Sequence, residues 1–244
     1  MGLMGPLETM SQNTMREILD VNLMGTIRTI QTFMPGMKAR RSGRILVTGS
    51  IGGLQGLPFN EVYCASKFAV EGVCESLAIL LQHFNIQWVT RLCETAHLTP
   101  ATGRKLCPVL PVHIVLYLCR VACTCRFSHV SLIECGPVNT HFLSNLQQAD
   151  PRDALLLQVD QLTRQLYDMY LKHCANVFIS AAQEAQDIVQ VFLEAISSPS
   201  PSLRYYTNSA LLPLTSLKLA MHDGSQYIRA MSKFIFSPAS AEDA

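Results

Sequence analysis

The sequence has little charge and few aromatic side chains. Only 15% of its 244 residues are charged, the formal net charge is +1, and there is a single tryptophan. So small an excess of positive charge provides no basic surface for nucleic acid, and a nucleic-acid-binding function is not expected. The apolar stretch Val112–Cys125 is too short to cross a bilayer, and Arg120 interrupts it. We therefore expect no membrane span, while contact with a membrane surface stays open.

Regular cysteine spacing is also missing. The nine cysteines follow no repeating pattern, and the chain does not open on a signal peptide, which favours reduced thiols and a cytoplasmic location. Cys119, Cys123 and Cys125 stand near His113 and His129. Zinc sites usually add a second matched pair of ligands, and none is evident here. We predict no metal site.

One segment carries a specific chemical pattern. Arg44–Ser50 has the composition of a short buried strand that ends at Gly49, and a glycine-rich loop leads from it to a helix expected to begin near Asn60 or Glu61. A loop of that length can return the chain so that Ser50 faces Tyr63 across a cleft.

Tyr63 and Lys67 are four residues apart, so both lie on one face of that helix. A lysine ammonium in this position can stabilise a tyrosinate and lower the phenol pKa. Such a phenol beside the Ser50 hydroxyl suits the interconversion of carbonyl and alcohol groups. A tyrosine and a lysine at this spacing often mark only a solvated helix face, but the order of strand, serine, glycine-rich loop and Tyr-x-x-x-Lys is more specific.

The rest of the chain alternates between helix and strand patterns. Ser11 is expected to cap a helix that reaches about Phe33 and leaves through Pro35-Gly36. Further elements are expected as a helix over 61–84, a strand over 131–134, helices within 150–173 and 181–195, and a strand over 203–207. No internal repeat is present.

These motifs resemble the short-chain dehydrogenase/reductase family, in particular its members that act on steroids, with retinoid-acting members as near relatives. Ser50, Tyr63 and Lys67 match the catalytic set of that family, and Asn22 in Leu19–Asn22 matches its fourth member. The resemblance implies that Tyr63 is the general acid or base, that Ser50 binds the substrate oxygen, and that Lys67 holds the nicotinamide ribose. Asn22 would position a water.

The resemblance also implies a cofactor and a substrate. NADP or NAD would contact Tyr63 and Lys67, and the segment after the next strand would lie against the nicotinamide through Gly136, Pro137, Val138 and Thr140. The substrate would be a small apolar carbonyl or alcohol of the steroid kind, bound by Ser50, Leu57, Asn60, Tyr170, His173 and Phe178. The acidic partner that relatives place beside the histidine is replaced by Phe234, which weakens the prediction of phenol recognition.

The sequence departs from the family in two places. The chain opens at Met1–Glu8, which in the family follows the fourth strand, and no Gly-x-x-x-Gly-x-Gly or Gly-x-Gly-x-x-Gly turn for the pyrophosphate follows an N-terminal strand. The choice between NADP and NAD therefore stays open. Residues 88–129 interrupt the likeness at a helix–strand joint and are interpreted as an insertion.

The expected fold is α/β: a partial Rossmann-like, doubly wound parallel sheet that lacks the first strands, with C-terminal substrate-cap helices. We expect one incomplete domain over 1–236, cap helices within 141–180 and a tail over 237–244. Two functions remain open. One is a nicotinamide-dependent oxidoreductase that interconverts steroid 17-ketones and 17-hydroxyls, or retinal and retinol. The other is an inactive fragment that acts only in association, and by resemblance a homodimer is possible.

Overall fold

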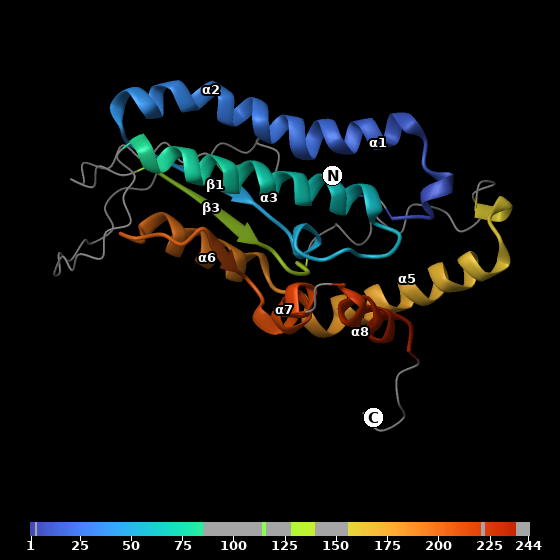
Figure 1. The fold of residues 1–244 in the computed structure, drawn as a ribbon. Coiled ribbons are helices and arrows are strands. Elements are labelled where there is room, and N and C mark those ends of the chain that lie inside the picture. Colours follow the sequence, from blue (N-terminus) through green and yellow to red (C-terminus); the bar gives the residue numbers. More distant parts are fainter. Residues whose placement is uncertain (3, 85–113, 116–127, 140–155, 221–222, 238–244) are drawn as a thin grey trace.

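The computed structural model describes residues 1–2, 4–84, 114–115, 128–139, 156–220 and 223–237. A four-stranded sheet with the strand order β2-β1-β3-β4 lies between two layers of helices (Figure 1). Its strands are β1 (Gly43–Thr48), β2 (Ile114–Val115), β3 (Ser128–Glu134) and β4 (Arg204–Tyr206). The Rossmann-like α/β architecture predicted from the sequence is confirmed.

Both faces of β1 are buried, as in parallel sheets that have helices on each side. Ile45 and Val47 pack against α2 (Gly25–Arg40) and α3 (Glu61–Leu81), whereas Leu46 packs with Ala195 of α6 (Ala185–Ser197). β1 pairs in parallel with β3 from Gly43↔Ser128 to Thr48↔Ile133, and β3 pairs in parallel with β4. The apolar run in the sequence therefore forms the central strand of the described sheet.

One pairing differs from the expected parallel sheet. β2 pairs antiparallel with β1, Leu46 opposite Val115 and Val47 opposite Ile114. One edge of β1 is thus covered over two residues by a strand from the segment interpreted as an insertion. β3 also begins at Ser128, three residues before the predicted start and inside that same segment.

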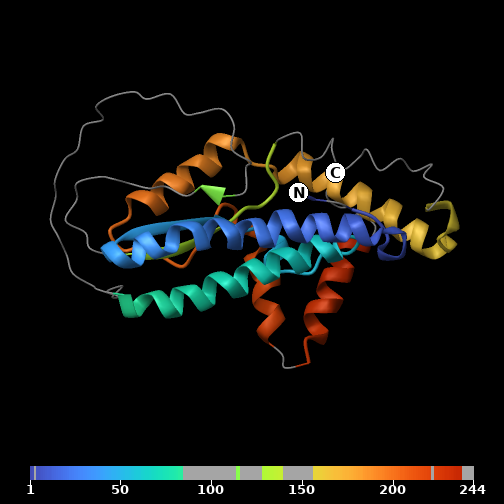
Figure 2. The ribbon, with the colours of Figure 1, turned by 90° about the horizontal axis from the view of Figure 1, so that it is seen from above.

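The N-terminal helical segment is longer than predicted. Ser11 caps α1 (Gln12–Leu19) by accepting a hydrogen bond from the Thr14 amide at 3.1 Å, as expected. A π-helical turn, η2 (Asp20–Met24), then joins α1 to α2. The predicted exit at Pro35-Gly36 is wrong, because the helix continues through Pro35 and ends at Arg40. Its C-cap residue Arg41 has a left-handed φ of 49°. Figure 2 shows this long segment lying alongside α3.

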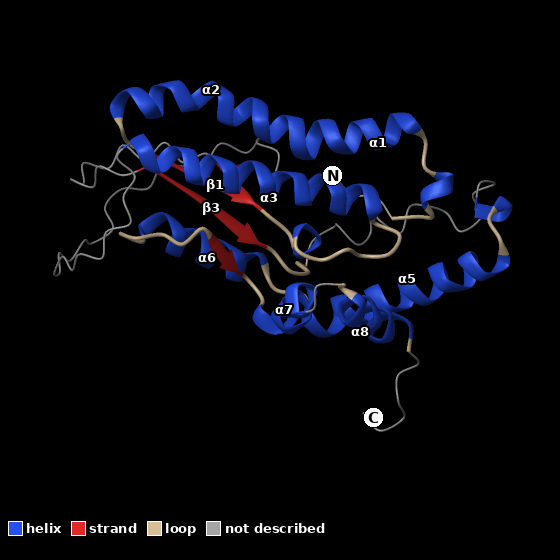
Figure 3. Ribbon diagram, viewed as in Figure 1, coloured by secondary structure: helices blue, strands red, loops and turns tan. Residues whose placement is uncertain are grey.

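The C-terminal third is mainly helical (Figure 3). α5 (Gln161–Ala181) runs past the predicted end at residue 173, and α6 begins at Ala185 rather than Ala181, because a capping box between Glu184 and Asp187 starts it. Two helices that the sequence patterns did not predict, α7 (Leu212–Ala220) and α8 (Ser225–Phe236), pack against each other, and α8 also packs on α5. In Figure 2 this pair projects from one side of the sheet layer.

The 3-10 segments are short and lie at joints. They are η1 (Leu7–Thr9), η3 (Ile51–Gly53), η4 (Gln82–Phe84), η5 (Leu156–Gln158) and η6 (Ser209–Leu211).

A second apolar cluster joins the loop before α3 to α5 and α8, and its central members are Phe59, Tyr167, Tyr170, Tyr227 and Met231. This cluster attaches the predicted cap helices to the end of the sheet where β1 and β3 finish.

Candidate active site

The carboxyl end of β1 positions Ser50. The Gly49 amide donates to the Ile133 carbonyl at 2.9 Å, and the Ile51 amide donates to the Cys135 carbonyl at 3.1 Å. These two hydrogen bonds hold the turn at Ser50, which lies between Gly49 and Ile51, against the end of β3. The Ser50 hydroxyl accepts a hydrogen bond from the Gly52 amide at 3.2 Å, which begins η3 and returns the chain toward α3.

Tyr63 lies in the first turn of α3, and the Ser50 side chain lies close enough to its phenol to lower the phenol pKa. Its ring packs directly on Gly52, where an added Cβ would lie 3.0 Å from Cε1 of the tyrosine. Burial raises the pKa of Tyr63 to about 12, against a smaller lowering by the Ser50 side chain. The expectation of an acidified phenol is therefore wrong for this structure, because desolvation of the tyrosinate outweighs the stabilising contacts.

Lys67 lies one turn after Tyr63 and is buried. Its ammonium donates a hydrogen bond to the Thr48 carbonyl at 3.1 Å, and Nζ lies 6.0 Å from the centroid of the Tyr63 ring. Burial lowers the lysine pKa, while Cys135, Glu134 and Glu71 act in the opposite direction. An ammonium has three donors, so this side chain has capacity for further oxygen acceptors.

Asn22 lies within the π-helical turn, a geometry that often marks functional sites. Its buried amide donates to the Ser66 hydroxyl at 3.0 Å and to the Met1 carbonyl at 2.9 Å. Ser66 in turn donates to the Tyr63 carbonyl at 2.6 Å. The structure therefore joins Asn22 to the helix that carries Tyr63 and Lys67, through the backbone of α3.

The segment predicted to contact the nicotinamide follows β3. The Gly136 amide donates to the Thr207 hydroxyl at 3.1 Å, and the Pro137 carbonyl accepts from the Gln183 amide at 2.9 Å. Val138 forms an isolated parallel bridge with Gln183. The segment is thus held to β4 and to the start of α6, beside the end of β1. Thr140 lies outside the described residues.

The predicted substrate residues fall into two groups. Asn60 and Tyr170 are both buried, and the Asn60 amide donates to the Tyr170 hydroxyl at 2.9 Å. His173 lies one turn further along α5 and packs edge-on against Phe234 of α8, with 4.8 Å between ring centroids. Leu57 packs on the cap cluster, and Phe178 lies further along α5, toward its end.

Several polar residues near this site carried no recognisable sequence motif. Glu134 ends β3, and its carboxyl group lies against Gly49, next to Ser50. Gln183 has a buried Oε1 without a hydrogen-bond partner, near Gly136. Glu134 could have been noticed only as a charged residue that ends an otherwise apolar strand, and Gln183 gave no signal.

The residues that the structure describes contain neither a cluster of metal ligands nor a membrane-spanning helix. No group of three or more metal-ligating side chains occurs among them, and Cys119, Cys123 and Cys125 lie outside them. Within the same ranges, no helix is long and apolar enough to cross a membrane. The described cysteines, Cys64, Cys74, Cys135 and Cys174, are free thiols.

Several known proteins have sequences similar to this chain. Residues 1–105 match the family described as short chain dehydrogenase. The chain is 41% identical over 244 residues to 17-beta-hydroxysteroid dehydrogenase type 1 of Homo sapiens, covering 99% of this chain and 61% of that protein. It is 37% identical over 237 residues to retinol dehydrogenase 8 of Homo sapiens, covering 97% and 62%. The chain thus spans less than two thirds of the length of these relatives.

Solved structures support the fold. A short chain dehydrogenase/reductase from Burkholderia phymatum in complex with NAD aligns with a TM-score of 0.58 at 22% identity, covering 92% of this chain and 63% of that one. A short chain dehydrogenase from Burkholderia cenocepacia in complex with NADP aligns with a TM-score of 0.54 at 16% identity, covering 98% and 67%. At these identities the likeness concerns the fold alone.

Proposed function

The chain belongs to the short-chain dehydrogenase family, and from this premise we propose that its site reduces an apolar, steroid-like ketone to an alcohol with a nicotinamide cofactor. The observation that carries the proposal is the gathering of three side chains at the carboxyl end of β1. Ser50 lies close enough to the Tyr63 phenol to lower its pKa, and Lys67 Nζ lies 6.0 Å from the centroid of the Tyr63 ring. Ligands of open α/β sheets bind beyond the carboxyl ends of the strands.

The proton chemistry centres on the Tyr63 phenol. A pKa of about 12 keeps its proton in place at neutral pH, so the group is ready to donate to a carbonyl oxygen. The Ser50 hydroxyl, already close to the phenol, would bind the same oxygen. As that oxygen gains negative charge, the nearby Lys67 ammonium would ease proton loss from the phenol by stabilising the tyrosinate. This order of events favours reduction over oxidation.

The residues present fit one end of the cofactor. Lys67 uses one of its three donors on Thr48, which leaves capacity for the hydroxyls of a ribose, and the Gln183 carbonyl oxygen lies buried and unpartnered near Gly136. When bound, the nicotinamide would supply the hydride. Gly136, Pro137, Val138 and Thr140 are the proposed contacts to this end, and the choice between NAD and NADP is left to measurement.

The substrate class is proposed from the relatives and from the cap. The relatives include a hydroxysteroid dehydrogenase and a retinol dehydrogenase. His173 faces the Phe234 ring, and burial lowers the histidine pKa, so a neutral imidazole lies in apolar surroundings. This favours an apolar far end of the substrate over a phenol. Retinal is the alternative substrate, and Leu57, Asn60, Tyr170 and Phe178 would complete the binding surface.

A function without catalysis is the second candidate. It is favoured by the short antiparallel cover on the edge of β1, which pairs over two residues only. In that case α2 and α3, which the family resemblance assigns to a dimer interface, would associate with another chain. A homodimer through these helices stays a prediction.

Turnover with saturating reduced cofactor separates the two candidates. Purified chain is assayed with estrone, with a ketosteroid that lacks a phenol and with retinal, following loss of cofactor absorbance. Tyr63→Phe should lower the rate about 10²- to 10⁴-fold, the usual contribution of a positioned acid. Tyr206→Phe, at a half-exposed site on β4, is the matched control and should leave the rate unchanged. An unaffected Tyr63→Phe rate, or no turnover of any substrate, would overturn the enzymatic proposal.

A further inference from the structure

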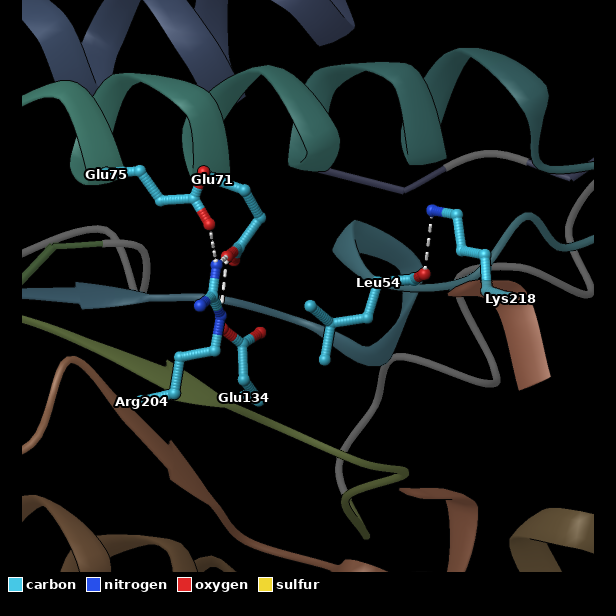
Figure 4. Close-up of polar contacts among 6 residues, drawn as sticks. All are labelled: Leu54, Glu71, Glu75, Glu134, Arg204 and Lys218. Carbon is cyan, nitrogen blue, oxygen red and sulfur yellow. Dashed lines mark hydrogen bonds and ion pairs between the residues drawn. The ribbon is translucent and has the colours of Figure 1, made fainter. Parts of the chain in front are cut away.

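A buried cluster of charges lies beside the candidate site. The Arg204 side chain of β4 reaches α3, where Nε and Nη2 donate to Glu71 Oε2 at 3.1 and 2.8 Å and Nη2 also donates to Glu75. Arg204 Nε lies 3.9 Å from Glu134 Oε1. Figure 4 shows the guanidinium among the three carboxyl groups. The same view shows Lys218 of α7 bonded to the Leu54 carbonyl, which holds the neighbouring loop.

Several carboxyl oxygens in this cluster lack a hydrogen-bond donor. Glu134 exposes 1% of its side chain, and no donor meets hydrogen-bond geometry at either oxygen. The Ser50 backbone amide is near enough only to lower the carboxyl pKa in part. Glu71 exposes 8%, and its Oε1 is likewise buried without a donor. The 3.9 Å separation from Arg204 is too long for a hydrogen bond. A buried carboxylate without donors is costly, and one guanidinium cannot neutralise three carboxylates.

The Glu134 carboxyl group also cannot move away. An added Cβ on Gly49 would overlap Oε2 and lie 2.8 Å from Cδ of Glu134. The group is therefore enclosed between the turn that carries Ser50 and the side of α3 that carries Glu71. Glu71 is close enough to Glu134 to raise the pKa of its carboxyl group, and a proton shared between the two carboxyl groups would supply the missing donor.

We propose that Glu134 is protonated at neutral pH, donates to Glu71 Oε1, and thereby acts as a positioning residue for Tyr63 and Lys67. The protonation of Glu134 does not depend on the proposed function. Only its effect on catalysis by Tyr63 and Lys67 rests on that function. The shared proton ties α3 to the end of β3 one turn beyond Lys67. It also removes a negative charge that would otherwise lie close to the ammonium and oppose ionisation of the phenol.

Electrostatics support this assignment. Burial and the neighbouring Glu71 raise the pKa of Glu134 well above its ordinary value, while Arg204 lowers it in part. Glu134 in turn raises the pKa of Tyr63 and of Lys67. The titratable and charged groups that face it come from three directions. They are Tyr63, Lys67, Glu71, Cys74 and Glu75 of α3, Cys135 after β3, and Arg204 and Tyr206 of β4.

Carboxyl titration by NMR tests the protonation directly, with no cofactor, substrate or turnover. Protein labelled at the glutamate carboxyl carbons should show one resonance that titrates in the alkaline range. Glu134→Gln, which is neutral and nearly the same shape, should remove it. Glu71→Gln should move it toward the ordinary range, and Glu75→Gln, at a half-exposed position, is the control that should keep it alkaline. If every glutamate of the wild-type chain titrates in the ordinary acidic range, the proposal fails without reference to any variant.

The positioning role has its own readout. Tyr63 titrates near pH 12, where Glu134 of the wild-type chain has lost its proton and its carboxylate opposes the tyrosinate. In Glu134→Gln the pKa of Tyr63, followed through its ring carbon resonance, should therefore fall. A merely structural role would leave that pKa unchanged, and such a result would refute positioning. A fall in the pKa together with a normal rate for Tyr63→Phe would leave the shared proton in place and reject the proposed function instead.

Discussion

Replacing Gly49 with alanine tests the packing on which the site depends. An added Cβ would overlap Oε2 of Glu134 and lie 2.8 Å from its Cδ, closer than real Cβ atoms approach other atoms. Neither group can yield easily, because Gly49 is fixed to Ile133 by a backbone hydrogen bond and Glu134 exposes only 1% of its side chain. Gly72 is the natural control, because an added Cβ there meets nothing within 4 Å, inside α3.

The two substitutions should change stability in opposite directions. Overpacking of a buried site costs about 1–3 kcal/mol, so Gly49→Ala should lower the free energy of unfolding by that amount. Gly72→Ala should raise it by roughly 0.5–1 kcal/mol, since glycine is less favourable than alanine inside a helix. For a chain of this size about 1 kcal/mol corresponds to roughly 2–4 °C in Tm. Gly49→Ala should therefore melt about 2–12 °C lower than wild type.

Thermal and urea unfolding followed by circular dichroism measure both effects. A double-mutant cycle with Glu134→Ala identifies the cause, because the alanine at position 49 would fill space that the shortened side chain leaves. The coupling energy should exceed about 0.5 kcal/mol, as for residues in direct contact. A Gly49→Ala chain as stable as Gly72→Ala, or a pair of changes that simply add, would refute the close approach.

Three further predictions follow from the same geometry. Because the pKa of Glu134 is raised from 4.5 to about 9 in the folded chain, stability should fall as pH rises through that window; Glu134→Gln should remove about 1.4 kcal/mol per pH unit of this slope in urea melts. In Gly52→Ala the new Cβ would lie 3.0 Å from the Tyr63 ring, so the turnover rate should fall clearly while the Tm changes little. Phe234→Glu should raise the His173 pKa in NMR titration, because it adds a carboxylate beside the ring, and Phe234→Gln is the neutral control.

Local signals in the sequence predicted the parts of the site that are close along the chain. The apolar run before Gly49, the glycines after Ser50 and the Tyr63–Lys67 spacing each have a short-range physical cause. They place the strand, the turn and the helix without knowledge of the rest of the fold. Ser11 as a helix cap belongs to the same class, since its hydrogen bond spans three residues.

Contacts between distant residues escaped prediction. The Glu71–Arg204 ion pair joins residues 133 positions apart, and no local pattern marks Glu134 as their neighbour. The antiparallel β2 depends on a pairing between Leu46 and Val115 that propensity does not encode. Pro35 was interpreted as a helix end, yet packing of Ile30 and Met37 against the sheet retains the helix across it. Burial also reversed the expected pKa shift of Tyr63.

The wide turn at Asp20–Met24 has a consequence for the whole first helical layer. The inward residues Ile18, Asn22, Thr26 and Ile30 recur every four positions, and all are buried. In a regular α-helix each step of four advances about 40° too far around the axis, since 3.6 residues complete a turn. The locally underwound backbone absorbs part of that drift. One continuous stripe can therefore stay in phase with α3, and Asn22 keeps its orientation toward Ser66.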